Sequence, residues 1–342
     1  MRTSFKVLSV SAALASMAVC LPTEYFKRDL ASVAKLAMCL PRFVADGTWG
    51  ADCQAAAAFP GLLPATKLNQ LTLDFTTGEA PLASSTEIVG SLIEIPGVTL
   101  PATKIKYKVD LSFDGAVIGT VDTPYADTSV TNAALTIAMA PVVVIIDAKA
   151  QAGFAAFMTA IVTKDSVIVP LEGKMDISFN FKSLLEMQPS VKVVSGIGYQ
   201  TTTVFPGLKG LPDIKVVSLI ANTPDADKKT QTISFKVNIN VASNLSVKLG
   251  DVEFNAAGPA GPIGTTTFKA LTLAHGDNTI EAVTVVDLSL AGAADFVSGL
   301  STADATLTLT GFADSTTNPL TVTAVEALKL TVVIPKQSTP AA

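Results

Sequence analysis

The stretch Phe59-Pro60-Gly61-Leu62 recurs as Phe205-Pro206-Gly207-Leu208, and in both places a Leu-Pro pair and a lysine follow. Further echoes come in the same order along the chain: Asp110-Leu111-Ser112-Phe113 with Asp251-Val252-Glu253-Phe254, Ile118-Gly119-Thr120 with Ile263-Gly264-Thr265, and Thr163-Lys164-Asp165-Ser166 with Thr302-Ala303-Asp304-Ala305. The offsets between the two copies lie between 139 and 148 residues. Solenoid repeats have periods of about 20–50 residues, so a spacing this long predicts a duplicated domain.

The composition describes an apolar, weakly acidic protein. Of its 342 residues, 49% are hydrophobic and 15% are charged, against a usual charged share of about 25%. Valine, threonine and leucine are abundant, and these residues suit a pleated, half-buried surface. The formal net charge of −5 provides no basic surface for phosphates, which argues against nucleic-acid binding.

Short apolar runs separated by Pro, Gly, Asp and Asn predict many short strands, a pattern typical of a sandwich or barrel. In the first copy the strands are expected at Lys67–Phe75, Glu87–Ile95, Ile105–Phe113, Ala133–Ala140, Val142–Ile146, Ser166–Leu171 and Met175–Phe181. In the second copy they are expected at Ile214–Ile220, Thr232–Val241, Ser246–Phe254, Thr266–Leu273, Ile280–Leu288, Ala305–Thr310 and Leu328–Ile334.

One segment in each copy has helical spacing. Phe154, Phe157, Met158 and Ile161 lie at i, i+3, i+4 and i+7, which predicts an amphipathic helix over Ala148–Val162. Its counterpart is expected at Gly292–Leu300. We therefore predict an all-β protein made of two tandem fibronectin III/immunoglobulin-like β-sandwiches, each with one short helix.

The repeat and the composition divide the chain into segments. We assign residues 1–22 to a signal peptide and 23–58 to an Ala-rich lead-in that contains a propeptide to residue 28. The first β-sandwich repeat is assigned to 59–204 and the second to 205–335. Residues 336–342 form a short polar tail, which we expect to be disordered.

The N-terminal segment resembles a secretory signal. Arg2 and Lys6 precede the uncharged run Val7–Val19, and small residues follow at the expected cleavage region. The run is shorter than the roughly 20 apolar residues of a membrane span, although an uncleaved signal anchor stays open as an alternative. The dibasic pair Lys27-Arg28 is read as a processing site, with a solvated charge pair as the other interpretation.

Cysteine usage and one triplet agree with export. Cys39 and Cys53 form a pair that closes a loop worth about 3 kcal/mol if it is oxidised. Two thiols without a nearby histidine argue against a zinc site. Asn244-Leu245-Ser246 is the single N-glycosylation sequon, and it predicts exposure of Asn244 near a strand end.

The sequence contains few residues with catalytic potential, and we predict no enzyme activity, no cofactor and no metal. His275 is the single histidine and lies in a sequence typical of a hairpin turn. No nucleophile elbow, phosphate loop or dinucleotide fingerprint is present. Asp165 and Asp304 occupy matched positions between helix and strand, so we interpret them as structural turn residues that bind backbone N–H groups. The alternative for this carboxylate pair is acid/base catalysis in a secreted hydrolase.

The second copy carries a family resemblance in the run from Ile233 to Phe254, the Gly/Pro turn before Ile263-Gly264-Thr265, and the segment Leu271–Asn278. This pattern resembles fungal proteins of unknown function with tandem domains like the late-embryogenesis-abundant type 2 (water-stress and hypersensitive-response) domain. The resemblance implies a β-sandwich of about seven strands with a short helix and no established enzyme activity. It also implies roles in protection under water stress or in binding lipid.

These observations lead to a functional expectation. We expect a secreted, non-enzymatic protein that acts by binding or by structural association at the cell surface or wall, with lipid or a cell-wall polymer as partner. The alternative is a lipid-binding or stress-protective module on an endomembrane, held by an uncleaved signal anchor and facing the lumen. Whether a copy of the domain encloses an apolar cavity is the property that would separate lipid binding from a merely packed core.

Overall fold

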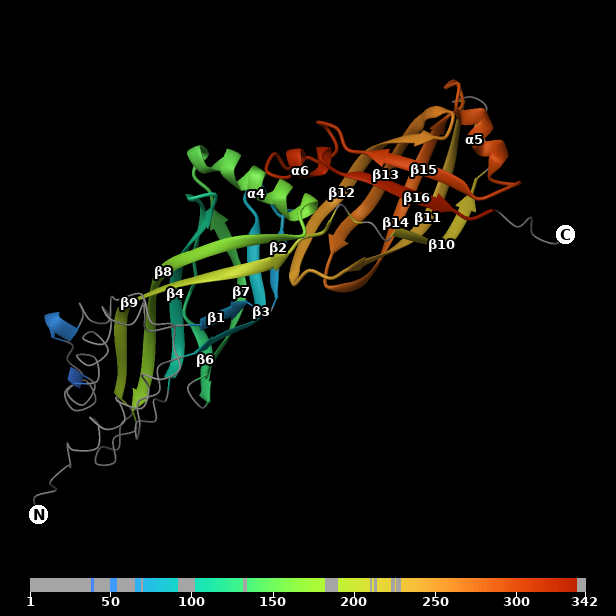
Figure 1. The fold of residues 1–342 in the computed structure, drawn as a ribbon. Coiled ribbons are helices and arrows are strands. Elements are labelled where there is room, and N and C mark those ends of the chain that lie inside the picture. The colour runs from blue at the N-terminus through green and yellow to red at the C-terminus, as the bar shows by residue number, and fades with distance from the viewer. Residues whose placement is uncertain are drawn as a thin grey trace, which may run out of the picture.

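The computed structural model describes residues 38–39, 50–53, 65–68, 70–91, 102–131, 134–181, 190–209, 211, 214–222, 225 and 229–336. The predicted signal segment 1–22, the pair Lys27-Arg28 and residues 337–342 of the predicted tail lie outside these residues. The described part is dominated by strands and forms an elongated molecule with two units placed end to end (Figure 1).

The second unit is a closed barrel of seven strands. The strands are β10 (Ile214–Ala221), β11 (Thr230–Val241), β12 (Leu245–Gly258), β13 (Gly261–Leu273), β14 (Gly276–Asp287), β15 (Ala305–Thr310) and β16 (Lys329–Ile334). They pair in the order β10-β11-β14-β13-β12-β15-β16, and β16 returns to β10 through the parallel pair Lys215–Val333. All other neighbours in this barrel are antiparallel.

The first unit repeats this strand order. Its strands are β1 (Ala65–Leu68), β2 (Leu71–Asp74), β3 (Leu82–Ser91), β4 (Ala102–Phe113), β5 (Ala116–Asp122), β6 (Ala126–Thr131), β7 (Ala134–Ile145), β8 (Ser166–Phe181) and β9 (Ser190–Pro206). The order β1-β3-β7-β5-β4-β8-β9 matches that of the second unit, and β1 lies against β9 as β10 lies against β16. The internal repeat of the sequence therefore corresponds to a repeated topology, to which β2 and β6 are additions.

The prediction of two fibronectin III/immunoglobulin-like sandwiches, and with it the fold implied by the family resemblance, is wrong. A sandwich keeps two sheets apart, whereas here one sheet coils until its first and last strands meet. The strands are longer than their sequences suggested, reaching 16 residues in β8 and 17 in β9. Long twisted strands close readily into a barrel, and inward and outward residues alternate in the same way in both architectures.

Two prolines explain why long strands were read as shorter ones. Pro170 lies within β8, but β4 pairs with β8 only as far as Leu171, so no hydrogen bond is lost on that side. Pro141 lies within β7 where the register with β3 shifts between Ala83 and Ser85. Proline is accepted in strands at such bulges and ladder ends. The strands β5, β6 and β9 were not predicted.

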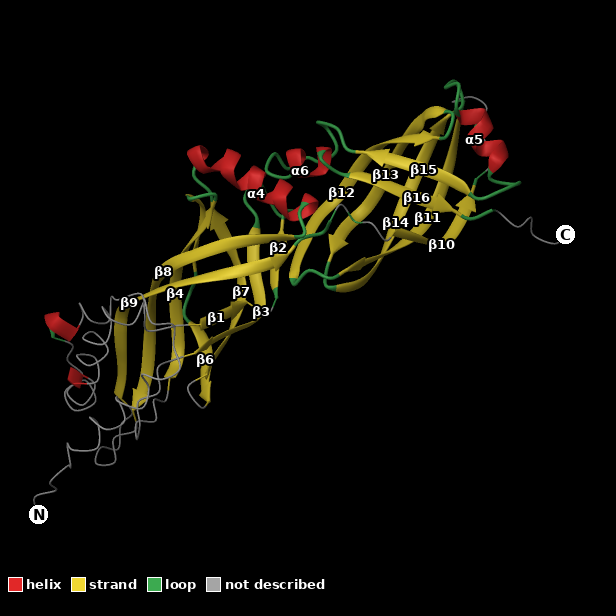
Figure 2. Ribbon diagram, in the orientation of Figure 1, coloured by secondary structure: helices red, strands yellow, loops and turns green. Residues whose placement is uncertain are grey.

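The predicted helices are confirmed. A short 3-10 turn, η3 (Ala148–Ala150), leads into α4 (Gln151–Thr163), and α5 (Ala293–Gly299) takes the same place in the second unit (Figure 2). Phe154, Phe157, Met158 and Ile161 are all buried, as their spacing predicted. A further helix, α6 (Val322–Glu326), has only five residues and is too short to show a period in the sequence.

The two units are joined by both sheet and helix contacts. β2 pairs in parallel with β12, which connects all sixteen strands into one sheet. Across this pair Lys248 Nζ lies 3.2 Å from Asp74 Oδ2, and α4 packs beside α6. The buried Asn318 donates from its side chain to the carbonyl oxygens of Gly78 and Glu79 at 3.0 and 3.3 Å. Such a junction holds the units as one continuous body.

The repeated Phe-Pro-Gly-Leu stretch has a structural role at this junction. Phe205 and Pro206 are the last residues of β9 and pair with the start of β8, so the predicted start of the second repeat at residue 205 falls at the end of this strand. Gly207 N then donates to the Asp165 carbonyl at 2.8 Å, and Leu208 N donates to the Ile161 carbonyl at 2.8 Å. These hydrogen bonds attach the stretch to the end of α4, just before the chain enters the second barrel.

Candidate ligand-binding interior of the first unit

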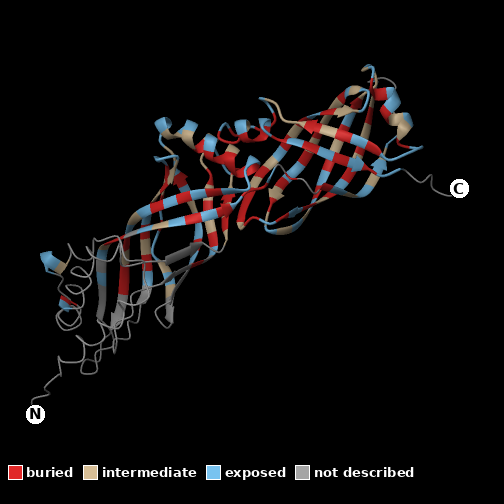
Figure 3. Ribbon diagram, viewed as in Figure 1, coloured by how far each residue is buried: buried red, intermediate tan, exposed pale blue. Residues whose placement is uncertain are grey.

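The interior of the second barrel is filled. Its inward side chains alternate along each strand with exposed ones (Figure 3). Val237, Val252, Leu307 and Leu309 each retain 0% of their exposable surface, and Phe254 packs edge-to-face on Phe268 with ring centroids 5.5 Å apart. This is the close packing expected of an ordinary protein core.

Several inward side chains of the first unit keep a small residual exposure within its buried core. Inward side chains from six strands retain between 5% and 8% of their exposable surface: Ile88, Tyr107, Val109, Leu111, Val121, Met139, Leu171, Met175 and Ile197. These residues lie at the middle of β4 and β8 and on the strands around them. In the second barrel, residual exposures of the same size, between 5% and 8%, occur at Ile214, Leu249, Ile280 and Ala305. A barrel of this size has room for side chains or for one small ligand.

Both units have a glycine at the matched position, Gly173 in the first and Gly311 in the second. Gly173 lies on β8 between the inward residues Leu171 and Met175, directly opposite Val109 of β4. A Cβ at Gly173 would overlap the Lys108 carbonyl, and a Cβ at Gly311 would overlap the Val325 carbonyl. The neighbouring backbone therefore occupies the space that a side chain at either position would need.

One end of this interior is closed by α4. Phe154 packs on Phe75 and on Phe157, and Phe157 packs on Phe113, all edge-to-face with centroid separations of 6.3, 5.8 and 5.7 Å. Both phenylalanines of the helix are buried to 1%. The phenylalanines of α4 thus cover one end of this interior, and the period-3.6 spacing of the helix places them there.

Two hydroxyl groups inside the first unit have no hydrogen-bond partner, those of Tyr107 and Thr203. Both residues are only 7% exposed. The backbone of Tyr107 is fixed by Thr123, whose hydroxyl accepts from Tyr107 N at 3.0 Å and donates to Tyr107 O at 3.2 Å. Burial raises the pKa of the Tyr107 phenol above its ordinary value, so this group stays protonated and able to donate. A buried donor without a partner is uncommon in proteins and calls for an explanation.

The sequence did not single out Tyr107, although the signal was present. Ile105, Tyr107, Val109 and Leu111 alternate with polar residues in β4, which identifies the tyrosine as inward-facing. What the sequence could not show is that the strands surrounding it provide no acceptor.

The structure places Asp165 and Asp304 in different surroundings. Asp304 Oδ1 accepts from the backbone N–H of Lys336 at 2.8 Å, so it caps the end of the last strand and not a local turn. The Asp165 carboxylate lies 3.3 Å from Lys209 Nζ, with both side chains exposed. The two residues belong to separate units and do not form a carboxylate pair.

The matched residues Asp110 and Asp251 are also apart. Asp110 accepts from the Thr120 hydroxyl at 2.6 Å, while Asp251 accepts from Lys269 Nζ at 2.6 Å and from Ala270 N at 2.9 Å. The hydrogen bond from Lys269, followed by that from Ala270, holds the pKa of Asp251 below its ordinary value. Both are ordinary outward-facing strand residues.

His275 is exposed in the turn between β13 and β14, as its sequence predicted. The neighbouring Asn278 supports this turn, since its side chain bonds the backbone of Ala274 in both directions, at 2.7 and 2.9 Å. In the residues that the structure describes, no group of three or more His, Cys, Asp or Glu side chains is placed to hold a metal ion.

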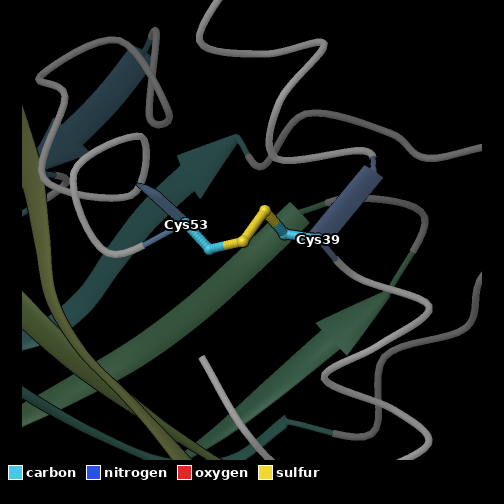
Figure 4. The surroundings of a disulfide bond; sticks show 2 residues. All are labelled: Cys39 and Cys53. Atoms are coloured by element: carbon cyan, nitrogen blue, oxygen red, sulfur yellow. A yellow bond between two sulfur atoms is a disulfide. The ribbon is translucent and has the colours of Figure 1, made fainter. Parts of the chain in front are cut away.

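Cys39 and Cys53 are joined by a disulfide, with their Cα atoms 5.8 Å apart (Figure 4). Asn244 lies immediately before β12, where it is half-buried, and Ser246 of the same sequon is buried. The exposure expected of this sequon is therefore only partly met, and its glycosylation stays a prediction. Across the described ranges, no helix is both long enough and apolar enough to cross a membrane.

Comparison with protein families finds a match of unknown function over part of the chain. A family model described as "Protein of unknown function (DUF3712)" matches residues 117–256, which run from β5 in the first unit to β12 in the second. No curated protein matches the chain.

Among solved structures, the exo-chitosanase CsxA of Amycolatopsis orientalis matches with 14% identity and a TM-score of 0.20 over 78% of this chain. Two of its complexes with PNP-beta-D-glucosamine match with 14% identity and a TM-score of 0.19 over the same share. The matched region is 26% of each enzyme chain, so this chain spans about a quarter of their length. Similarity this low provides no basis for assigning an activity.

Proposed function

We propose that this protein acts by binding and not by catalysis, and that the interior of the first unit takes up a small apolar ligand. The observation that carries the proposal is the residual exposure of 5–8% that inward apolar side chains keep on six strands of the first unit. The apolar lining at the middle of β4 and β8 supplies the burial that drives such binding, at about 25 cal/mol per Å² of ligand surface removed from water. The filled second barrel serves as a rigid support.

The exterior of the molecule favours this proposal over binding to a cell-wall polymer. Flat polysaccharide surfaces are commonly bound by rows of exposed aromatic rings. Among the large hydrophobic side chains that are exposed in the described part of the chain, Tyr125 is the one aromatic residue. The others are aliphatic or methionine and occur on several different strands.

We also propose that the protein is exported in soluble form. Of the two alternatives raised by its N-terminal sequence, this favours a signal peptide over an uncleaved signal anchor. The hydrophobic leader and the Cys39–Cys53 disulfide support export, because such bonds persist in oxidising compartments. Kinship with the fungal late-embryogenesis-abundant type 2-like proteins belongs to the same proposal and rests on the motif run from Ile233 to Phe254. The mass of the natively expressed protein tests export, since a chain that still begins at Met1 would contradict it.

Ligand binding is tested with the full-length protein in two steps. Native mass spectrometry of the freshly purified protein is expected to show a bound apolar molecule, and the delipidated protein is expected to enhance the fluorescence of 1,6-diphenylhexatriene. Leu171→Phe, which enlarges an inward side chain at the middle of β8, is expected to reduce probe uptake. Val333→Phe serves as the control, because Val333 is exposed on the outside of the second barrel. A protein that carries no ligand and takes up no probe would refute the proposal.

A further inference from the structure

The end of β10 in the second unit is the counterpart of β2 in the first. The lysines that follow the repeated Phe-Pro-Gly-Leu stretch lie 148 residues apart, an offset that matches Thr72 with Ile220. The register agrees, because Thr72 pairs with Ser84 of β3 and Ile220 pairs with Ser234 of β11. Since β2 is the strand that joins the first unit to β12, the molecule carries the same junction strand again, at the end of the second unit that lies away from the first (Figure 1).

In the first unit this strand is covered on its outer edge. Leu71 N donates to the Asn244 carbonyl at 3.1 Å, at the start of the parallel pairing with β12. Phe75 N donates to the Lys248 carbonyl at 2.9 Å, at its end. With this cover in place, Leu71 and Leu73 are buried to 5% and 2% exposure.

The corresponding edge of β10 has no such cover. β16 pairs with β10 only at its start, so the rest of β10 continues past that strand. Asn222 N donates to the Thr232 carbonyl of β11 at 3.0 Å. Because successive N–H groups of a strand point to opposite sides, those of Leu219 and Ala221 point away from β11. Neither group donates to any residue in the part of the chain that the structure describes.

The side chains of this edge are exposed as well. Val217 and Ile220 retain 57% and 64% of their exposable surface, and Leu219 and Ala221 are half-buried. The run 216–221 contains no charged residue and no proline, which are the usual protections of a free strand edge. An edge of this composition pairs readily with another strand.

The strand starts that could receive this edge as β12 receives β2 are already covered in both units. The start of β12 is covered by β2 of the same chain. The echo of Asp110 in Asp251 matches the start of β4 with the start of β12. There β6 pairs with β4, through Lys104 with Asp127 and Ile105 with Ala126. Copies of the chain therefore cannot join head to tail through this pairing, whereas the β10 edge of a second copy is as open as the first.

We propose that two copies of this chain associate through their β10 edges, with residues 217–221 of the two strands paired antiparallel about a two-fold axis. The N–H groups of Leu219 and Ala221 then gain carbonyl partners, and Val217 and Ile220 pack against side chains of the other strand. The interface is self-complementary, as two-fold symmetry requires, and no like charges meet along the paired residues. This association is independent of ligand binding in the first unit.

Sedimentation velocity of the natively expressed protein tests the association. Because the paired segment is short, a dimer with a dissociation constant in the micromolar range or weaker is expected, and concentrations from about 1 to 300 μM cover it. Ile220→Lys puts a charge on both edges and removes an apolar contact from each, so it should raise the dissociation constant at least about 10-fold. Circular dichroism should show this variant folded, since Ile220 is exposed.

Ile168→Lys is the matched control. Ile168 is 60% exposed, which is close to the exposure of Ile220, but it lies on β8 of the first unit, outside the proposed interface. This variant is expected to dimerise as the wild type does. Amide hydrogen exchange locates the interface, because the N–H groups of Leu219 and Ala221 should exchange more slowly in the dimer than in dilute monomer.

Three results would overturn the inference. The first is a protein that stays monomeric up to about 300 μM, including one that carries a strand of a different protein at this edge, seen as a co-purifying mass. The second is a dimer that Ile220→Lys does not weaken, or that leaves the N–H groups of Leu219 and Ala221 unprotected. The third is a chain that dimerises only when it is shortened to end at Lys336, which would show that residues 337–342 of the same chain occupy the edge.

Discussion

Leu171 and Leu309 are expected to respond differently to the same substitution. Leu171 in β8 and Leu309 in β15 are inward-facing leucines on corresponding strands of the two units. Leu171 is 7% exposed, whereas Leu309 is 0% exposed. We consider the change of each leucine to phenylalanine, which enlarges the side chain without introducing polarity or charge.

The magnitude follows from the surroundings of each residue. In a filled core, added side-chain volume forces strained rotamers and backbone shifts that cost about 1–3 kcal/mol. Leu309→Phe is therefore expected to lower the free energy of unfolding by about 1–3 kcal/mol. Leu171 keeps part of its surface exposed, so a larger ring is expected to be accommodated with less strain. Leu171→Phe is expected to change the free energy of unfolding by less than about 1 kcal/mol.

Urea denaturation followed by far-ultraviolet circular dichroism measures both values, with the ligand removed beforehand because a bound ligand would stabilise the native state. The urea dependence of each variant must match that of the wild type for the comparison to hold. Equal destabilisation of both variants by more than about 1 kcal/mol would show that the interior of the first unit is as tightly filled as the second barrel. That result would refute the structural basis of the proposed function.

Three further predictions concern residues at the junction between the two units. Burial opposes ionisation of Asp74, but hydrogen bonds from Thr76 and the ion pair with Lys248 outweigh it and hold the pKa of Asp74 below its ordinary value. The ionised Asp74 therefore contributes to stability at neutral pH, and this contribution is lost as the pH falls through the lowered pKa. The urea midpoint is therefore expected to be constant between about pH 5 and 7 and to fall below about pH 4, and the fall should be smaller in Asp74→Asn. Asn318→Ala removes the buried amide that donates to the Gly78 and Glu79 carbonyls and should cost about 1–3 kcal/mol in urea denaturation, an expectation that a neutral result would contradict. Gly207→Ala should reduce the melting temperature by several degrees, because its Cβ would overlap the Lys164 carbonyl, whereas Gly78→Ala, with open space around it, should not.

Parts of this architecture could be read directly from local pattern. The i, i+3, i+4, i+7 spacing of Phe154, Phe157, Met158 and Ile161 placed α4, because an apolar stripe on a helix must face a core. The alternation from Ile105 to Leu111 placed β4 for the corresponding reason in a strand. The hairpin turn at His275 could be read because Gly and Asn define such turns locally.

Other features depend on partners that are distant in the chain. Pro141 and Pro170 suggested strand ends, yet both are accommodated because β3 shifts its register and the pairing of β4 with β8 stops at Leu171. Asp304 was read as a local turn residue, but its partner is the backbone of Lys336, 32 residues later. Local sequence carries no information about which distant strand ends where.

The sequence by itself determined that the domain is duplicated, that its elements are strands with a helix in each copy, and that the chain is poor in charged residues. These properties depend on residue type and period, which are local. Only the tertiary structure decided that each sheet coils toward a barrel, that β2 and β12 join the copies into one sheet, and that Tyr107 meets no acceptor. The closure of a sheet depends on the summed twist and pairing of long strands, and the filling of its interior depends on how side chains from six strands meet. The Phe-Pro-Gly-Leu stretch shows the same division, since its repetition was visible in the sequence, while its attachment to the end of α4 required Gly207 and Lys164 to be brought together by the fold.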